Sequence, residues 1–404
     1  MVDEQALAGL KVLDVTHYIA GPFCTKLLAD YGADVIKVEK PGKGDGVRRM
    51  GPFPGDIPDP EKSGLFLYLN TNKRGITLNL KTKTGVELFK NLVKESDILV
   101  ENFSPRVMPS LGLDYQTLKK VNPRLVMTSI SSFGQTGPYR DCRAAEITLF
   151  ALSGRMYKTG DPDREPLKYA LNVYQYYGGE VASLATLAAV MGRETTGDGE
   201  YIDLSILETI LGDVENQITW WDFSKEKGVR LNAKNLPLYP WGAFPTKDGF
   251  VSIQGVGRGE AWIPRLFTMI GKPELMEDPR FSTPQSRMDN IDEFNALLYS
   301  WLADHTKQEI FDEADRVRYP VAPVYSTEEL VKNPHYQERD YFVEIDHPRA
   351  GKLTYPGAPF KMSRAGWAIR RPAPRLGEHN REVYCELLGY SKDDLVTLRS
   401  LDVI

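Results

Sequence analysis

Short apolar runs alternate with amphipathic stretches along the first 210 residues. The β-type run 11–15 is followed by the turn Gly21-Pro22, by helical apolar spacing over 23–31, and by a second β-type run, 34–38. This order predicts a strand, a helix and a second strand. Further strands are expected at 76–80, 98–100, 125–129 and 201–204, and helices at 86–95, 115–121 and 178–193. Strands that alternate with helices predict an α/β fold, with a Rossmann-like parallel sheet covered on both faces.

A change of composition after residue 220 predicts a second, smaller α/β domain. Prolines and polar residues gather between 222 and 249, as in a linker. A strand at 250–254 and helices near 262–270, 292–303 and 307–316 follow, and Pro320 and Pro323 mark the exit. We therefore expect a large domain at 1–220, a small domain with linkers at 221–325, and a return segment at 326–404 that completes the large domain.

Charge and cysteine content exclude several classes of protein. The 404 residues carry 50 basic and 55 acidic side chains, so no cationic excess is available for nucleic acid. No apolar run approaches 18 residues and the N-terminal residues are charged, so we expect neither a membrane span nor a signal peptide. Cys24, Cys142 and Cys385 are far apart, and no histidine or cysteine pair has metal-ligand spacing. These features predict a cytoplasmic protein without a metal site.

The first strand, helix and strand admit a nicotinamide-dependent enzyme as an alternative. Glu39 ends the second strand, where an acid could hold a ribose hydroxyl. However, His17, Tyr18 and Ile19 occupy the turn where the GxGxxG fingerprint needs close approach of the backbone. We therefore disfavour a dinucleotide site.

A series of motifs runs in order through nearly the whole chain. They are Gly21-Pro22, residues 28–39, Gly44-Asp45, residues 70–74, 101–103, 111–113, 122–124, 133–139, 196–197, 203–205, 322–324 and 374–379. The series resembles the class III CoA-transferases, the CaiB/BaiF-like family that includes formyl-CoA transferase, carnitine CoA-transferase and the α-methylacyl-CoA racemases. The resemblance implies a large CoA-binding domain, a smaller domain, and dimers in which two chains interlock.

The resemblance also implies that coenzyme A binds as a substrate across the large domain, with no permanently bound cofactor. The expected contacts are His17, Tyr18, Ile19, Lys40, Asn70, Asn72, Lys73, Arg74, Asn102, Phe103 and Arg143. Cations suit the phosphates of CoA, while loop backbone groups and apolar walls suit its pantetheine arm. Without the resemblance, Lys73 and Arg74 would be interpreted as charges of a solvated turn.

The family's transferases use an aspartate as nucleophile. It attacks the acyl-CoA thioester to give a mixed anhydride, which the CoA thiolate converts to an aspartyl-CoA thioester; CoA then passes to the acceptor carboxylate. The resemblance places this position at Gln175, flanked by Tyr174, Tyr176 and Tyr177, which could block the thioester end of the CoA channel. A carboxamide has no anionic oxygen, so the chain is expected to lack its own nucleophile. Glu146 is the best spare carboxylate, and its favoured role is that of a hydrogen-bonding acid.

Two further positions depart from the family pattern. Residues 232–235 replace the glycine-rich loop that some members fold over the acyl intermediate. Residues 143–146 retain Glu146 without the histidine-aspartate pair of the racemases, which argues against α-proton exchange.

These features predict the non-nucleophilic subunit of a hetero-oligomeric CoA-transferase, whose homologous partner supplies the aspartate. The donor would be an acyl-CoA such as succinyl-CoA and the acceptor a dicarboxylic acid. The arrangement resembles benzylsuccinate CoA-transferase of anaerobic toluene degradation, which would make (R)-benzylsuccinate the acceptor. Trp220, Trp221, Phe223 and Trp241 could line an apolar pocket or belong to a core. Two alternatives remain: an active homodimer that uses Glu146 or another acid such as Glu180, and a CoA-binding scaffold protein.

Overall fold

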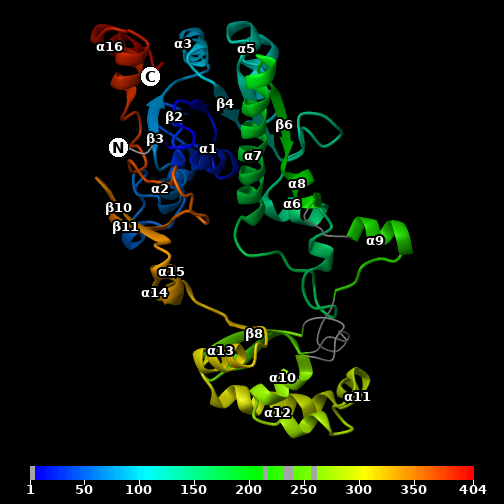
Figure 1. The fold of residues 1–404 in the computed structure, drawn as a ribbon. Coiled ribbons are helices and arrows are strands. Elements are labelled where there is room, and N and C mark those ends of the chain that lie inside the picture. Colours follow the sequence, from blue (N-terminus) through cyan, green and yellow to red (C-terminus); the bar gives the residue numbers. More distant parts are fainter. Residues whose placement is uncertain (1–4, 213–216, 231–239, 256–261) are drawn as a thin grey trace. The chain divides into compact units, whose positions relative to one another are not determined.

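The chain forms two compact units in the computed structural model, which describes residues 5–212, 217–230, 240–255 and 262–404 (Figure 1). Unit 1 comprises Met1–Arg155, Lys168–Thr219 and Glu338–Ile404, and unit 2 comprises Met156–Leu167 and Trp220–Gln337. Residues 232–235, where the sequence departs from the glycine-rich loop, lie outside the described residues.

The units differ in two segments from the domain limits expected from sequence. Unit 2 includes residues 156–167, because the Arg230 guanidinium donates hydrogen bonds to the carbonyls of Tyr157, Asp161 and Arg164. It also keeps residues 326–337, where Glu329 forms an ion pair with Lys307. These links are made by polar side chains, which hydrophobic periodicity does not reveal.

A six-stranded parallel sheet organises unit 1 and confirms the expected fold class. The strands are β1 (Lys11–Asp14), β2 (Asp34–Glu39), β3 (Lys73–Thr77), β4 (Ile98–Glu101), β5 (Val126–Ser131) and β6 (Tyr201–Ser205). Their order in the sheet is β3-β2-β1-β4-β5-β6. Leu13 of β1 is in register with Ile36 on one side and with Leu99 on the other. The strand order therefore reverses between β1 and β4, and ligands of such sheets bind at the carboxyl edge near this point.

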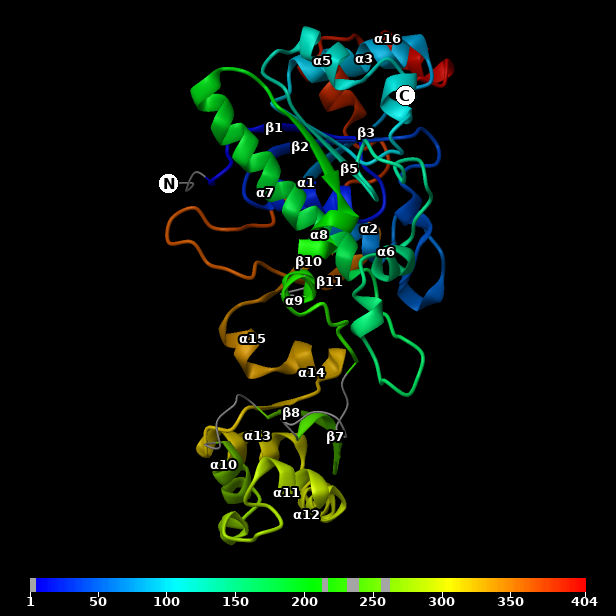
Figure 2. The same cartoon turned by 90° about the vertical axis from the view of Figure 1, so that its right-hand side faces the viewer.

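Helices cover both faces of the sheet (Figure 2). One face carries α1 (Ala20–Asp30) and α7 (Val173–Thr196); the other carries α3 (Lys83–Lys94), α5 (Tyr115–Val121) and α16 (Lys392–Ser400). The second face forms the main core, in which Leu13, Ile36 and Ile76 of the strands pack with Phe89, Leu118 and Leu398. On the first face α1 and α7 are in close contact, because a Cβ on Gly179 would lie only 2.6 Å from the Ala20 carbonyl oxygen.

The C-terminal segment covers the edge of the sheet that β3 forms. The Gly75 N–H donates to His379 Nδ1, the Thr77 N–H donates to Asn380 Oδ1, and the Tyr384 hydroxyl donates to the Thr77 carbonyl. Edge strands need such covering because their unpaired backbone groups otherwise recruit other chains. Unit 1 is completed by α2 (Gly64–Leu69), α4 (Val107–Ser110), α6 (Glu146–Leu152), α8 (Ile206–Gly212) and the antiparallel hairpin of β10 (Phe342–His347) and β11 (Gly351–Pro356). It also contains the short helical turns η1 (Gly46–Arg49), η2 (Pro54–Asp56) and η5 (Glu382–Leu387).

Unit 2 is built around a three-stranded antiparallel sheet. Its strands are β7 (Trp241–Thr246), β8 (Gly249–Gln254) and β9 (Val321–Pro323). Its larger helices are α10 (Trp262–Met269), α12 (Ile291–Asp304) and α13 (Lys307–Arg316), and its shorter ones are α11 (Pro284–Asp289), α14 (Thr327–Lys332) and α15 (Pro334–Glu338). The 3-10 turns are η3 (Met156–Lys158) and η4 (Pro273–Met276). Phe267, Phe281 and Phe294 form the centre of its core, and α9 (Gln217–Ser224) spans the boundary between the units.

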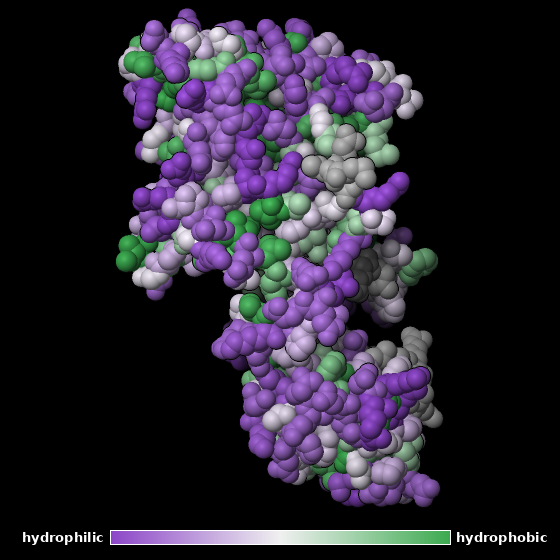
Figure 3. Space-filling view, turned by 60° about the vertical axis from the view of Figure 1, so that its left-hand side comes forward, coloured by the Kyte–Doolittle hydropathy of each residue, from purple (hydrophilic) through white to green (hydrophobic). Residues whose placement is uncertain are grey.

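The surface is mainly hydrophilic on the face drawn in Figure 3, where hydrophobic residues occur in small groups. Within the described ranges, no helix has the length and apolar character needed to cross a membrane. Trp220, Trp221, Phe223 and Trp241 are each between 44% and 87% exposed, so none of them is a core residue in this structure.

Candidate functional site

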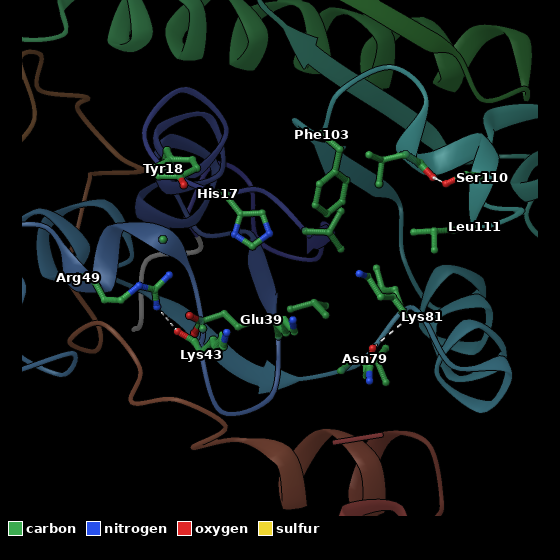
Figure 4. Close-up of a pocket in the computed structure, with 18 residues that line it drawn as sticks. His17, Tyr18, Glu39, Lys43, Arg49, Asn79, Lys81, Phe103, Ser110 and Leu111 are labelled. Carbon is green, nitrogen blue, oxygen red and sulfur yellow. Dashed lines mark hydrogen bonds between the residues drawn. The ribbon is translucent and has the colours of Figure 1, made fainter. Parts of the chain in front are cut away.

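A cavity of about 530 Å³ opens at the carboxyl edge of the sheet in unit 1 (Figure 4). It is formed by the residues that end or follow β1, β2, β3 and β4, as expected for the switch point of this strand order. The lining residues are Val15, His17, Tyr18, Val38, Glu39, Lys40, Lys43, Gly44, Gly46, Arg49, Leu78, Asn79, Leu80, Lys81, Phe103, Val107, Ser110 and Leu111.

Four exposed cations give the cavity a positive character. They are Lys40, Lys43, Arg49 and Lys81, and Figure 4 shows Lys43, Arg49 and Lys81 around the same space as His17 and Phe103. Glu39 is the single carboxylate among the lining residues, and its two oxygens accept hydrogen bonds of 2.7 Å from the buried Arg48 guanidinium. Its charge is therefore already neutralised. A cation-rich, partly apolar cavity of this kind suits a phosphorylated ligand with an apolar arm.

An amide side chain joins the loops that follow β1 and β4. Asn102 Oδ1 accepts the His17 N–H at 2.8 Å, and Asn102 Nδ2 donates to the His17 carbonyl at 2.7 Å. The His17 and Phe103 rings lie 5.5 Å apart between centroids. This two-way link joins the two loops that carry these rings on the wall of the cavity.

Tyr18 has an unusual backbone conformation. Its φ angle is 64°, in the left-handed region, which costs a residue other than glycine about 1–2 kcal/mol. Its N–H donates to the buried Asp45 carboxylate at 3.0 Å, and a hydrogen bond to a charged group contributes roughly 1.5–3 kcal/mol. The bond therefore offsets the strain, and the Tyr18 ring, 56% exposed, lies on the cavity.

A buried network of charges lies beneath this edge of the sheet. Asp14 Oδ2 is 3.0 Å from Lys73 Nζ and 4.0 Å from Lys37 Nζ, and all three residues are fully buried. Burial alone would raise the pKa of Asp14, but the two lysines and two threonine hydroxyls lower it to about 2. Burial lowers the pKa of Lys73 to about 8 despite its contact with Asp14. These charges stabilise one another inside the fold and do not reach the cavity.

Several residues expected to contact CoA lie away from the cavity. Asn70 accepts a hydrogen bond from Lys73 Nζ, Asn72 donates to Asp30 at 2.7 Å, and Arg74 pairs with Asp34 and Glu382. These residues precede or begin β3, whereas the cavity lies at the carboxyl ends of the strands. Ile19 is buried with Phe23 and Leu69 in a small hydrophobic cluster.

A second cavity, of about 660 Å³, follows β4 and β5 and shares Phe103 with the first. Asn102 and Arg143, both expected from sequence, line it together with Ser131, Arg106 and Arg140. Asp141 accepts two hydrogen bonds, of 2.8 and 2.6 Å, from Arg106. The structure thus brings His17, Tyr18, Lys40 and Phe103 to the first cavity, and Asn102, Phe103 and Arg143 to the second.

Gln175 lies in the first turn of α7 and is half-buried. The preceding residue, Tyr174, donates its main-chain N–H to Glu146 Oε1 at 2.8 Å. Glu146 is only 8% exposed; burial raises the pKa of its carboxyl, an effect that the Tyr174 N–H partly opposes. The Tyr174 ring packs against Phe150 at 5.4 Å and the Tyr176 ring contacts Phe23 edge-on at 4.9 Å, so these two tyrosines pack within unit 1.

The sequence analysis did not assign several polar residues of the first cavity to CoA, among them Lys43, Arg49, Asn79 and Lys81. It assigned Asn79 to a strand at 76–80, although β3 ends at Thr77. The signal that could have found Asn79 and Lys81 is their position directly after a buried strand of a parallel sheet.

Comparisons with known proteins agree with this architecture. The sequence profile of CoA-transferase family III matches residues 7–380. Succinyl-CoA--D-citramalate CoA-transferase of Chloroflexus aurantiacus is 33% identical over 98% of both chains. The succinyl-CoA--L-malate CoA-transferase beta subunit of the same organism is also 33% identical, again over 98% of both chains. The crystal structure of a CAIB/BAIF family protein from Brucella suis superposes with a TM-score of 0.85 at 30% identity, covering 95% of this chain and 100% of that one. The chain therefore belongs to CoA-transferase family III, whose members take CoA thioesters as substrates.

Proposed function

We propose that this chain is the CoA-binding, non-nucleophilic subunit of a hetero-oligomeric CoA-transferase that moves CoA from succinyl-CoA to a dicarboxylic acid. One observation carries the proposal. The first turn of α7 presents the carboxamide of Gln175 where the family resemblance expects the attacking aspartate. A neutral amide cannot form the mixed anhydride on which CoA transfer depends.

The cavities support CoA binding by this chain. Lys40, Lys43, Arg49 and Lys81 are exposed cations that suit the phosphates of CoA. The second cavity continues past Phe103 along the ends of β4 and β5, in the manner required for a long arm that leaves the phosphate site.

The alternative of an active homodimer has less support, because neither spare carboxylate suits a nucleophile. Glu146 is buried and its Oε1 is bonded to the Tyr174 N–H. Glu180 follows Gln175 by five residues on α7, and at about 100° per residue it faces a different side of the helix.

The name of one relative, as well as Gln175, supports a second subunit. One relative that is 33% identical over nearly the whole chain is named as a beta subunit. The acceptor in our proposal is a dicarboxylate, and (R)-benzylsuccinate is the first compound to test because it follows from the sequence resemblance. A CoA-binding scaffold protein remains the second candidate, since the cavities alone support binding without turnover.

The test is CoA exchange between succinyl-CoA and a panel of dicarboxylates that includes (R)-benzylsuccinate. The chain is assayed alone and together with a homologous subunit from the same genome that carries the aspartate. We expect turnover only with both chains, and we expect Gln175→Asn in this chain to leave that turnover within two-fold. Turnover by this chain alone would overturn the proposal. Tight CoA binding with no turnover in any combination would favour the scaffold.

A further inference from the structure

We infer that Asp45 is a positioning residue of the CoA cavity: it bonds directly to the Tyr18 N–H and, together with the buried Lys37, holds His17 and Tyr18, the two residues that form the lip of the cavity after β1. This inference rests on the proposed CoA binding. Asp45 does not line the cavity itself, so it acts through the residues that it holds.

The Asp45 carboxylate is completely buried and connects three segments. Its Oδ1 accepts the N–H of Tyr18 and the N–H of Val47, each at 3.0 Å. Its Oδ2 lies 3.1 Å from Lys37 Nζ on β2. One side chain therefore fixes the loop after β1, the turn η1 and the strand β2 to one another.

Lys37 holds the same lip from its other side. Its ammonium group donates to the Thr16 carbonyl at 3.0 Å, directly before His17, and it is completely buried. The chain on both sides of His17 is thus bonded, at Thr16 by Lys37 and at Tyr18 by Asp45. Asp45 Oδ1 also lies 3.8 Å from His17 Nδ1.

The Tyr18 ring is held by the same loop that holds its backbone. The ring lies against Gly46, where an added Cβ would come within 2.7 Å of Tyr18 Cε1 and Cζ. Gly46 has no positive φ, so the position needs glycine for space and not for backbone conformation. Asp45 fixes the left-handed backbone of Tyr18, and Gly46 leaves room for its ring on the cavity.

The experiment measures CoA binding to the chain by calorimetry, and hydrogen-deuterium exchange of the peptide that contains Tyr18. Asp45→Asn is expected to weaken CoA binding about ten-fold and to accelerate exchange at the Tyr18 amide. Gly46→Ala should also weaken CoA binding, because the added methyl group displaces the end of the Tyr18 ring from its place on the cavity. In a Tyr18→Ala background, Gly46→Ala should add nothing.

Asp30→Asn is the matched control. Asp30 is an equally buried aspartate of unit 1, paired with Lys26 at 2.7 Å and bonded to Asn72, and it does not line the cavity. We expect Asp30→Asn to lower the melting temperature while CoA affinity and Tyr18 exchange stay at the wild-type values.

The outcomes separate the inference from the proposed function. If the wild type binds CoA and both Asp45→Asn and Gly46→Ala bind it equally well, the inference is overturned and the proposed function stands. Equal weakening by Asp45→Asn and Asp30→Asn would show a general loss of stability and would also overturn the inference. If the wild type binds no CoA, the proposed function fails, and the positioning role fails with it.

Discussion

Glu146 caps the helix that carries Gln175: its Oε1 accepts the main-chain N–H of Tyr174, the second residue of α7, at 2.8 Å. The N-cap residue of α7, Asn172, makes no side-chain capping bond. A carboxylate near a helix N-terminus satisfies an otherwise unpaired N–H and interacts favourably with the helix dipole. The acid beside the family's nucleophile position therefore has a structural role in this chain.

Removing this cap should affect stability more than transfer. We expect Glu146→Ala to lower the free energy of unfolding by about 1 kcal/mol, while Glu146→Gln, which keeps an acceptor oxygen, costs less. Denaturant titration measures both. In the proposed two-subunit enzyme, Glu146→Gln should keep most of the turnover, and a loss of a hundred-fold or more would show that the carboxylate takes part in the chemistry.

The two ends of the sheet should differ in their effect on CoA affinity. Lys81 lies on the cavity, and Lys81→Ala should weaken CoA binding about ten-fold because an ammonium group near a phosphate is lost. Arg74→Ala is the comparison, since Arg74 pairs with Asp34 and Glu382 beside the amino end of β3. Its CoA affinity should equal that of the wild type. The reverse pattern would mean that CoA binds at the other edge of the sheet.

Substitution of glycine by alanine should have opposite effects on stability at two positions of α7. Gly179→Ala would place a Cβ 2.6 Å from the Ala20 carbonyl oxygen, so α1 and α7 must move apart, at a cost of roughly 1–3 kcal/mol. Gly192 has no atom within 4 Å of an added Cβ, and Gly192→Ala should stabilise the protein by about 0.5–1 kcal/mol. Thermal unfolding of the two variants distinguishes the effects. Equal destabilisation would contradict the close contact of α1 with α7.

The buried Glu101 should make the stability of the folded protein depend on pH. Its side chain is buried at the end of β4, and burial raises its pKa to about 7 from its usual value near 4.5. Between these two pH values the folded chain retains a proton that the unfolded chain releases, so this group lowers stability as pH rises from about 4.5 to 7. The full effect, roughly 3 kcal/mol, is present above pH 7.

Glu101→Gln removes this titration while its oxygen can still accept the Phe103 N–H. The variant should gain stability relative to the wild type at pH 8 and show little difference at pH 4.5. Glu95→Gln, at an exposed position, serves as the control and should change neither value much. A variant less stable than the wild type at pH 8 would contradict the prediction.

Much of the parallel fold followed from the sequence because its strands are short, apolar and buried on both faces. The expected strands at 11–15, 34–38 and 98–100 correspond to β1, β2 and β4, and the helix 115–121 corresponds to α5. The strand expected at 76–80 was wrong by three residues, because β3 begins at Lys73 and includes Arg74. Lys73 is buried only because Asp14, Thr25 and Asn70 bond to its ammonium group, and no hydrophobic pattern records such contacts.

The same three-residue shift explains why the sequence analysis missed Asn79 as a residue of the cavity. Asn79 was placed inside a strand, whereas in the structure it follows β3 and lines the cavity with Lys81. Lys43 and Arg49 come from the loop and turn after β2, where the Arg49 guanidinium donates to the Lys43 carbonyl. Loop geometry of this kind depends on long-range bonds such as those of Asp45, which a single sequence does not reveal.

The most direct test of the account is mass spectrometry after trapping with hydroxylamine. The chain is incubated with succinyl-CoA, alone and with the proposed homologous subunit, and hydroxylamine then marks any carboxylate that has been acylated. We predict a mass tag on the partner only, with none on Glu146, Glu180 or any other acid of this chain. A tag on this chain, formed in the absence of the partner, would contradict the account and identify a relocated nucleophile.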